Sequence, residues 1–92
     1  IAAGQQIRYF NTSLVFNPLG QLMGGYSKLH LFDLCIPGQI EFQESKIMTA
    51  GDHPLLLEMT AGWRVGLGIC YDLRFPRLAE YYRQRGADLL IY

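Results

Sequence analysis

The 92-residue sequence contains no apolar run long enough to span a bilayer, and no signal peptide is visible in it. It also lacks net charge, because eight basic and eight acidic residues cancel. A neutral chain gives no reason to expect nucleic acid or an anionic membrane surface as a partner. Repeats, low-complexity tracts and linkers are missing too. With 50% hydrophobic residues, the sequence therefore indicates a globular core and argues against disorder.

Cysteine is scarce, since only Cys35 and Cys70 are present and they form no CxxC pair. His30 and His53 are not at zinc-ligand spacing from them, so the sequence predicts no zinc site. A disulfide between the two cysteines stays an alternative, but free thiols in an intracellular protein are more typical of so apolar a chain. We expect the cytoplasm as its location, with the mitochondrion as the alternative.

The two ends of the chain indicate a piece of a larger domain. The sequence begins at Ile1 without a methionine and ends at Tyr92, inside an apolar run that starts at Leu89. Such a run is typical of a buried strand, where a native chain seldom stops. We therefore expect residues 1–92 to be an internal part of a single domain, incomplete at both ends.

Strands dominate the prediction, because apolar and polar residues alternate with a period of two in several segments. The strands are expected over residues 7–16, 21–30, 53–59, 63–70 and 87–92. Asn17-Pro18-Leu19-Gly20 has the chemistry of a tight turn, so the first two strands should form a hairpin. Residues 31–52 show no clean period, and we expect a long ordered loop there. A short reversal is expected at residues 60–62.

One helix is predicted over residues 75–85. Its apolar stripe, at helical spacing, consists of Phe75, Leu78, Ala79 and Tyr82. Pro76 sets φ for the first turn, and Gly86 suits the position that ends the helix. The strand–helix–strand order over residues 63–92 predicts two parallel neighbouring strands, and hence an α/β fold.

Cys70 closes the strand predicted over residues 63–70, at the junction with the helix. A sharp turn there would expose the thiol, and the helix amides and dipole favour its thiolate form. Gly66 and Gly68 have no side chains, so they are expected to keep the face of the cysteine open. Cys70 is therefore a candidate nucleophile, and the alternative is a buried structural cysteine.

A cysteine nucleophile needs a base and a group that stabilises an oxyanion. The residues able to supply these functions are Lys28, His30, Glu41, Glu44, His53 and Asp72. Lys28 lies on a predicted strand among aromatic and aliphatic residues, although lysines on strands commonly face solvent. For Glu44 the alternative is a solvated loop carboxylate. Asp72 and Arg74 are expected to form ion pairs around the turn rather than to react.

Three segments resemble the motifs of the nitrilase superfamily of carbon-nitrogen hydrolases. Tyr26-Ser27-Lys28-Leu29-His30-Leu31-Phe32-Asp33 is similar to the lysine motif of that family. Phe42-Gln43-Glu44-Ser45, followed by Ala50-Gly51, is similar to its second-glutamate segment. Gly66-Leu67-Gly68-Ile69-Cys70-Tyr71-Asp72-Leu73-Arg74-Phe75-Pro76 resembles its cysteine motif. The motifs occur in the family's order, with 16 positions from Lys28 to Glu44 and 42 from Lys28 to Cys70.

The resemblance implies a four-layer αββα sandwich, of which this chain would form part, and an amidase that uses no metal or organic cofactor. Cys70 would be the nucleophile that forms a thioester and releases ammonia or an amine. Lys28 would stabilise the oxyanion and transfer protons, Glu44 would support the lysine, and the backbone N–H of Tyr71 would complete the oxyanion hole. The general-base glutamate of the family would lie upstream, outside this chain. The family also implies a homodimer or a higher homo-oligomer.

Within the superfamily the motifs look most like the omega-amidase branch, which hydrolyses short dicarboxylic acid monoamides such as 2-oxoglutaramate. A deaminated-glutathione amidase is the second interpretation. A true nitrilase fits less well, because Tyr71 and Asp72 stand where nitrilases have Trp-Glu after the cysteine. The implied partner is thus a small-molecule amide substrate. From another class, the alternative is a non-catalytic or redox-sensing thiol domain in which Lys28 only activates Cys70.

Overall fold

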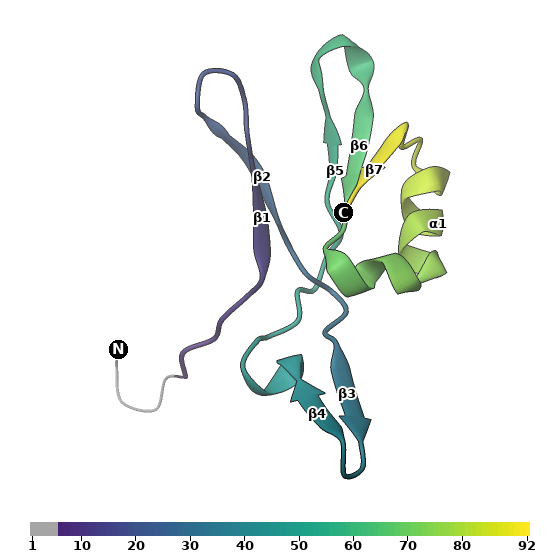
Figure 1. Cartoon of the computed structure of the whole chain (residues 1–92). Coiled ribbons are helices and arrows are strands. Elements are labelled where there is room, and N and C mark those ends of the chain that lie inside the picture. The colour runs from purple at the N-terminus through teal and green to yellow at the C-terminus, as the bar shows by residue number, and fades with distance from the viewer. Residues whose placement is uncertain (1–5) are drawn as a thin grey trace.

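The computed structural model describes residues 6–92, which form two hairpins, a three-stranded sheet and one α-helix (Figure 1). In Figure 1 the first hairpin and the three-stranded sheet extend upward from the centre of the molecule, and the second hairpin extends downward. The principal extents are 51 × 37 × 20 Å, so the unit is flat and elongated. None of its helices is both long and apolar enough to cross a membrane.

The first hairpin is confirmed. β1 (Thr12–Phe16) pairs antiparallel with β2 (Leu22–Ser27). The predicted turn joins them: Gly20 donates its N–H to the carbonyl of Asn17 at 2.9 Å. Both strands are shorter than predicted, and β2 ends one residue before Lys28. The lysine is therefore held at the end of a strand rather than within it.

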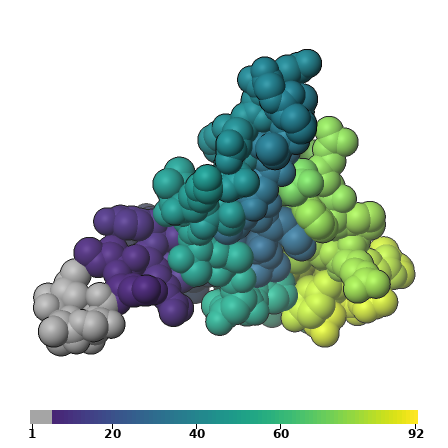
Figure 2. Space-filling model, turned by 90° about the horizontal axis from the view of Figure 1, so that it is seen from below, coloured from purple at the N-terminus to yellow at the C-terminus, as the bar shows by residue number. Residues whose placement is uncertain are grey.

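The prediction of a loop over residues 31–52 is wrong, because this segment contains a second hairpin. β3 (Asp33–Ile36) pairs antiparallel with β4 (Ile40–Gln43), and the short 3-10 helix η1 (Glu44–Lys46) follows. The hairpin stands out as the blue-to-teal projection in Figure 2. Each strand has only 4 residues, which is too short for an alternating pattern to be recognised in the sequence.

Two turns have the backbone that their residues suggest. In the second hairpin Gly38 has a φ of 74°, and Gln39 donates its N–H to the carbonyl of Ile36 at 3.0 Å. Pro37 before a glycine of positive φ is the signature of a type II turn, so a hairpin signal was present in the sequence. The reversal predicted at residues 60–62 is also present, as the 3-10 helix η2 (Thr60–Gly62).

The C-terminal half forms the predicted crossover unit. β6 (Arg64–Leu67) lies between β5 (Leu56–Glu58), to which it is antiparallel, and β7 (Leu89–Ile91), to which it is parallel. The helix α1 (Pro76–Gln84) connects β6 to β7, and Gly86 follows it with a φ of 82°. The predicted helix, its end signal and the parallel pair are confirmed.

The predicted role of Gly66 and Gly68 is wrong. A Cβ atom on Gly66 would lie 2.6 Å from the ring of Tyr82, and one on Gly68 would overlap the ring of Tyr92. The two glycines therefore admit aromatic rings from α1 and from the end of the chain. They do not open the face of Cys70, because the strand ends before the cysteine.

Tyr82 attaches α1 to the sheet. Its side chain is fully buried, and its hydroxyl donates to the carbonyl of Leu67 at 2.5 Å and accepts the N–H of Leu55 at 3.1 Å. Burial raises the pKa of this hydroxyl.

The buried apolar residues are Tyr26, Val65, Leu67, Leu78 and Tyr82. Large apolar side chains remain exposed elsewhere, for example at Leu14, Phe16, Phe42, Leu89 and Ile91. Residues 6–92 thus leave much of their own strand surface uncovered.

Candidate active site

Cys70 begins η3 (Cys70–Arg74), a 3-10 helix of 5 residues between β6 and α1. Its φ is 47°, in the left-handed region that costs a non-glycine residue about 1–2 kcal/mol. Backbone strain of this kind persists only where the surrounding structure imposes it, and it is common at active sites. The thiol is free and exposed, which excludes the alternative of a buried structural cysteine.

Asp72 closes the turn that carries the cysteine. Ile69 donates its N–H to Asp72 Oδ2 at 2.9 Å, and Asp72 donates its own N–H to the carbonyl of Ile69 at 3.0 Å. The N–H of Tyr71 lies in the first turn of η3, where no preceding helical carbonyl can accept it. The turn therefore presents the Cys70 thiol and a neighbouring backbone donor together.

Lys28 and Glu44 form a buried ion pair. Lys28 Nζ lies 2.7 Å from Glu44 Oε1, and the two side chains are only 3% and 11% exposed. This burial excludes the alternatives that Lys28 faces solvent and that Glu44 is a solvated loop carboxylate. Burial would raise the pKa of Glu44, but hydrogen bonds from Lys28 and from the N–H of Phe32, at 2.8 Å, outweigh it and lower the pKa. The buried Glu44 side chain is accordingly held in its ionised form against Lys28.

Backbone hydrogen bonds fix the lysine on both sides. Lys28 donates its N–H to the carbonyl of Asn11 at 2.8 Å, and its carbonyl accepts the N–H of Gly51 at 2.8 Å. The side chain of Asn11 also contributes to lowering the pKa of Glu44. The Ala50-Gly51 segment, which follows the glutamate in sequence, is thereby brought against Lys28.

A pocket of about 470 Å³ lies against the cysteine, and its lining residues are Phe32, Cys70, Tyr71, Leu73 and Arg74. Phe32 connects this pocket to the buried ion pair, since it lines the pocket while its N–H binds Glu44. The ring of Phe32 also packs edge-on against Tyr71, at 4.9 Å between centroids. Lys28 and Glu44 thus stand behind one wall of a pocket that exposes the thiol.

The expected ion pair of Arg74 is absent among residues 6–92, whereas Asp72 lies 2.7 Å from the Nδ1 atom of His30. Asp72 is fully buried and binds Tyr26 and His30, which lie far away in the sequence and could not be foreseen from it. Burial would raise the pKa of Asp72, but hydrogen bonds from Tyr26, Ile69 and His30 lower it. Arg74 lines the pocket instead, so sequence reasoning missed its position beside Cys70.

The other residues considered in the sequence analysis, Glu41, His53 and Cys35, lie outside this site. Glu41 pairs with Lys46 at 3.4 Å on the surface, and His53 pairs with the neighbouring Asp52 at 2.6 Å, also on the surface. Cys35 is a free, exposed thiol on β3. Within the described part of the chain, no three His, Cys, Asp or Glu side chains gather as a metal site would require.

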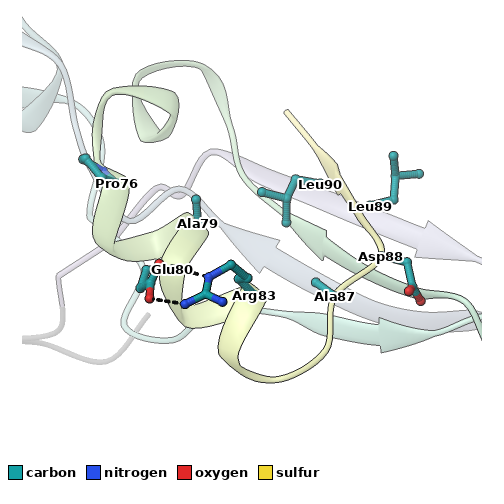
Figure 3. Close-up of a pocket in the computed structure, with 8 residues that line it drawn as sticks. All are labelled: Pro76, Ala79, Glu80, Arg83, Ala87, Asp88, Leu89 and Leu90. Atoms are coloured by element: carbon teal, nitrogen blue, oxygen red, sulfur yellow. Dashed lines mark hydrogen bonds and ion pairs between the residues drawn. The ribbon is translucent and has the colours of Figure 1, made fainter.

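A second pocket, of about 450 Å³, lies between α1 and the segment leading into β7 (Figure 3). Its lining residues are Pro76, Ala79, Glu80, Arg83, Ala87, Asp88, Leu89 and Leu90. Glu80 and Arg83 pair with each other at 2.7 Å along its rim. The lining holds no thiol, hydroxyl or imidazole.

The α/β fold thus combines a free, exposed thiol at a strained strand-to-helix turn with a buried lysine–glutamate pair behind one wall of the adjoining pocket. The profile of the carbon-nitrogen hydrolase family matches residues 2–92. The chain therefore belongs to the carbon-nitrogen hydrolase family.

Individual relatives agree with this assignment. Omega-amidase NIT2 of Homo sapiens is 52% identical over 85 residues, which are 92% of this chain and 30% of the human protein. The Caenorhabditis elegans NitFhit protein has a TM-score of 0.80 and 44% identity over 90% of this chain and 20% of its own. Saccharomyces cerevisiae Nit3, of branch 10 of the nitrilase superfamily, has a TM-score of 0.74 and 36% identity over 90% of this chain and 27% of its own. The predicted fold class is confirmed, and the chain spans about a third of the human relative.

Proposed function

We propose that the complete gene product is a thiol amidase that hydrolyses the terminal amide of a short dicarboxylic acid monoamide such as 2-oxoglutaramate. The buried Lys28–Glu44 pair behind the pocket that exposes Cys70 is the observation that carries this function. The 52% identity to a human omega-amidase supports the amide substrate. Residues 1–92 then supply an internal part of a single hydrolase domain, and the general-base glutamate comes from another part of the gene product.

The reaction proceeds in two halves on Cys70. The thiolate attacks the amide carbon and forms a C–S bond, and the carbonyl π electrons move onto oxygen. When the tetrahedral intermediate collapses, the C–N bond breaks and the nitrogen leaves as ammonia with a proton that the site delivers. Water then attacks the thioester, which releases the carboxylic acid and restores the thiol. Amide and water are consumed, and acid and ammonia are formed.

Charge stabilisation comes from two donors. The Lys28 ammonium and the backbone N–H of Tyr71 face the oxyanion of the tetrahedral intermediate, while Glu44 holds the lysine side chain in its orientation. This assignment is supported by the short Lys28–Glu44 distance of 2.7 Å and by the position of Tyr71 in the first turn of η3. Lys28 also relays protons between the thiol and the leaving nitrogen.

Arg74 gives the proposed substrate its second anchor. It lines the same pocket as Cys70, and among residues 6–92 no carboxylate pairs with it. A guanidinium binds a carboxylate with two parallel hydrogen bonds, which suits the free acid end of a dicarboxylic monoamide. A deaminated-glutathione substrate also carries carboxylates and is the second candidate. We further propose a homodimer or larger homo-oligomer, located in the cytoplasm or the mitochondrion.

Ammonia release by the complete gene product tests the function. With 2-oxoglutaramate as substrate, we expect the wild type and the matched variant Cys35→Ser to release ammonia, and Cys70→Ser to release none. Deaminated glutathione and a dinitrile, tested in parallel, distinguish the neighbouring substrate classes. Absence of release by the wild type, or release undiminished in Cys70→Ser, would rule out the amidase and leave a redox-sensing or non-catalytic thiol domain.

A further inference from the structure

We propose that Asp72 is a positioning residue that sets Lys28 and Cys70 relative to each other, with Tyr26 and His30 as its partners. This role deepens the amidase function proposed above and rests on it. Asp72 does not line the pocket, so it acts through the two groups that it connects.

Its carboxylate joins the lysine segment to the cysteine turn. One oxygen, Oδ2, accepts the Tyr26 hydroxyl at 2.5 Å and the N–H of Ile69 at 2.9 Å. The other oxygen, Oδ1, accepts the N–H of His30 at 3.0 Å and lies 2.7 Å from His30 Nδ1. Tyr26 and His30 stand two residues on either side of Lys28, and Ile69 directly precedes Cys70. One buried group therefore holds both flanks of the lysine and the approach to the thiol.

No other hydrogen bond duplicates this connection. In the part of the chain that the structure describes, every hydrogen bond between segments 26–32 and 69–75 ends on the Asp72 carboxylate. The remaining contacts are packing contacts, such as that of the Phe32 ring on Tyr71 at 4.9 Å. Packing lacks the directionality of a hydrogen bond. Without the carboxylate the two segments would still pack against each other, but their relative position would no longer be fixed.

His30 links the Asp72 carboxylate to the aromatic ring of Phe75. Its Nδ1 is engaged by Asp72, and its ring stacks on Phe75 with centroids 3.7 Å apart and planes 8° apart. These two contacts fix the ring from its edge and from its face. His53 and Asp52 form a pair with a similar distance, 2.6 Å, but they are neighbours in sequence and are 70% and 92% exposed. That surface pair is a matched control.

The test uses the complete gene product with four variants. Tyr26→Phe and His30→Phe each remove one link while keeping the ring, His30→Asn keeps a donor near Nδ1, and His53→Phe is the control. We expect kcat to fall about tenfold or more in the two link-removing variants while KM changes less than about threefold, because a small misplacement of reacting groups slows chemistry. We expect His30→Asn to recover most of the loss, and His53→Phe to match the wild type.

Thiol alkylation provides a readout that does not require the amidase reaction. Iodoacetamide labels Cys70 and Cys35, which lie on different tryptic peptides, so Cys35 serves as the internal reference. We expect the Cys70:Cys35 labelling ratio at pH 7 to fall several-fold in the two link-removing variants and to be unchanged in His53→Phe. If the wild type releases no ammonia, the amidase function fails, while this ratio still decides the positioning role.

Three results would overturn the inference. If kcat and the labelling ratio are unchanged in the two link-removing variants while their melting temperature falls, the role of Asp72 is only structural. Loss of activity in His30→Asn as complete as in His30→Phe would show that the imidazole itself takes part in the reaction. An equal change in His53→Phe would show that the effect is not specific to this carboxylate. Should His30→Phe fail to fold, Tyr26→Phe, which removes a single hydroxyl, carries the same test.

Discussion

Lys28 Nζ and Glu44 Oε1 lie 2.7 Å apart, although 16 positions and an entire hairpin separate the two residues in the sequence. The same oxygen accepts the N–H of Phe32, which stands at the wall of the pocket. The Lys28 side chain thus lies against a carboxylate in a place from which water is largely excluded. In such a place its effect on a developing negative charge is stronger than it would be in solvent.

Removal of the glutamate should destabilise the protein strongly. In Glu44→Ala, Lys28 would remain buried without a counter-charge, and breaking a buried pair costs about 3–5 kcal/mol. Denaturant unfolding of the complete gene product measures this loss. The matched control is Glu41→Ala, which breaks an exposed pair with Lys46 and should cost less than about 1 kcal/mol. Equal losses in the two variants would contradict the buried pair.

The ionisation of Asp72 should make the stability of the fold depend on pH. Its pKa is lower in the folded protein than the ordinary value of about 3.9. The ionised carboxylate therefore stabilises the fold above that ordinary value, and the stabilisation is lost as pH falls through the folded pKa. We expect the stability gap between the wild type and Asp72→Asn to be largest near neutrality and to narrow below about pH 4.

Urea unfolding at several pH values measures this gap, with the exposed Glu58→Gln as the reference variant. A gap that stays constant from neutral to acid conditions would show that the Asp72 carboxylate contributes no linked ionisation.

The Tyr82 hydroxyl should contribute measurably to stability. Tyr82→Phe would leave the carbonyl of Leu67 and the N–H of Leu55 buried without their partner, at a cost of about 1–3 kcal/mol. Thermal and chemical unfolding report the change. Tyr81→Phe is the control, because the Tyr81 hydroxyl makes no hydrogen bond to residues 6–92, and it should behave as the wild type. Similar stabilities for both variants would refute this role.

Arg74 should govern substrate affinity. Arg74→Ala would remove the proposed carboxylate anchor, and we expect KM for 2-oxoglutaramate to rise about tenfold to a hundredfold, since charge-assisted hydrogen bonds contribute about 1.5–3 kcal/mol. A neutral monoamide without the acid group should be affected much less. Arg77→Ala, on the exposed side of α1, is the control. Steady-state kinetics with both substrates decide the matter, and an equal rise in KM for both would contradict the anchor.

Local signals predicted most of the C-terminal half. The helical spacing of Leu78 and Tyr82, with Pro76 before them and Gly86 after them, correctly gave α1 and the parallel strands beside it. These features depend on neighbours within a few residues, so a single sequence contains them. The second hairpin was missed although Pro37-Gly38 marks its turn, because its strands are too short to show a period.

The candidate site, in contrast, could be predicted from the sequence only in part. Cys70, Lys28 and Glu44 were recognised through motifs, and the structure brings Lys28 and Glu44 into contact, while their catalytic roles stay predictions. The links of Asp72 to Tyr26 and His30 were not foreseen, because they span 46 and 42 positions. No spacing rule relates residues so far apart. Only the fold determines which buried donors meet one carboxylate.

The most direct test is to trap the acyl group on the thiol. The complete gene product is mixed with 2-oxoglutaramate, quenched in acid within the first turnovers and digested, and the peptide that contains Cys70 is examined by mass spectrometry. We expect this peptide to gain the mass of the substrate minus ammonia, and the Cys35 peptide to stay unmodified. A Cys70 peptide that never carries the acyl group, while ammonia is still released, would contradict the assignment of Cys70 as the nucleophile.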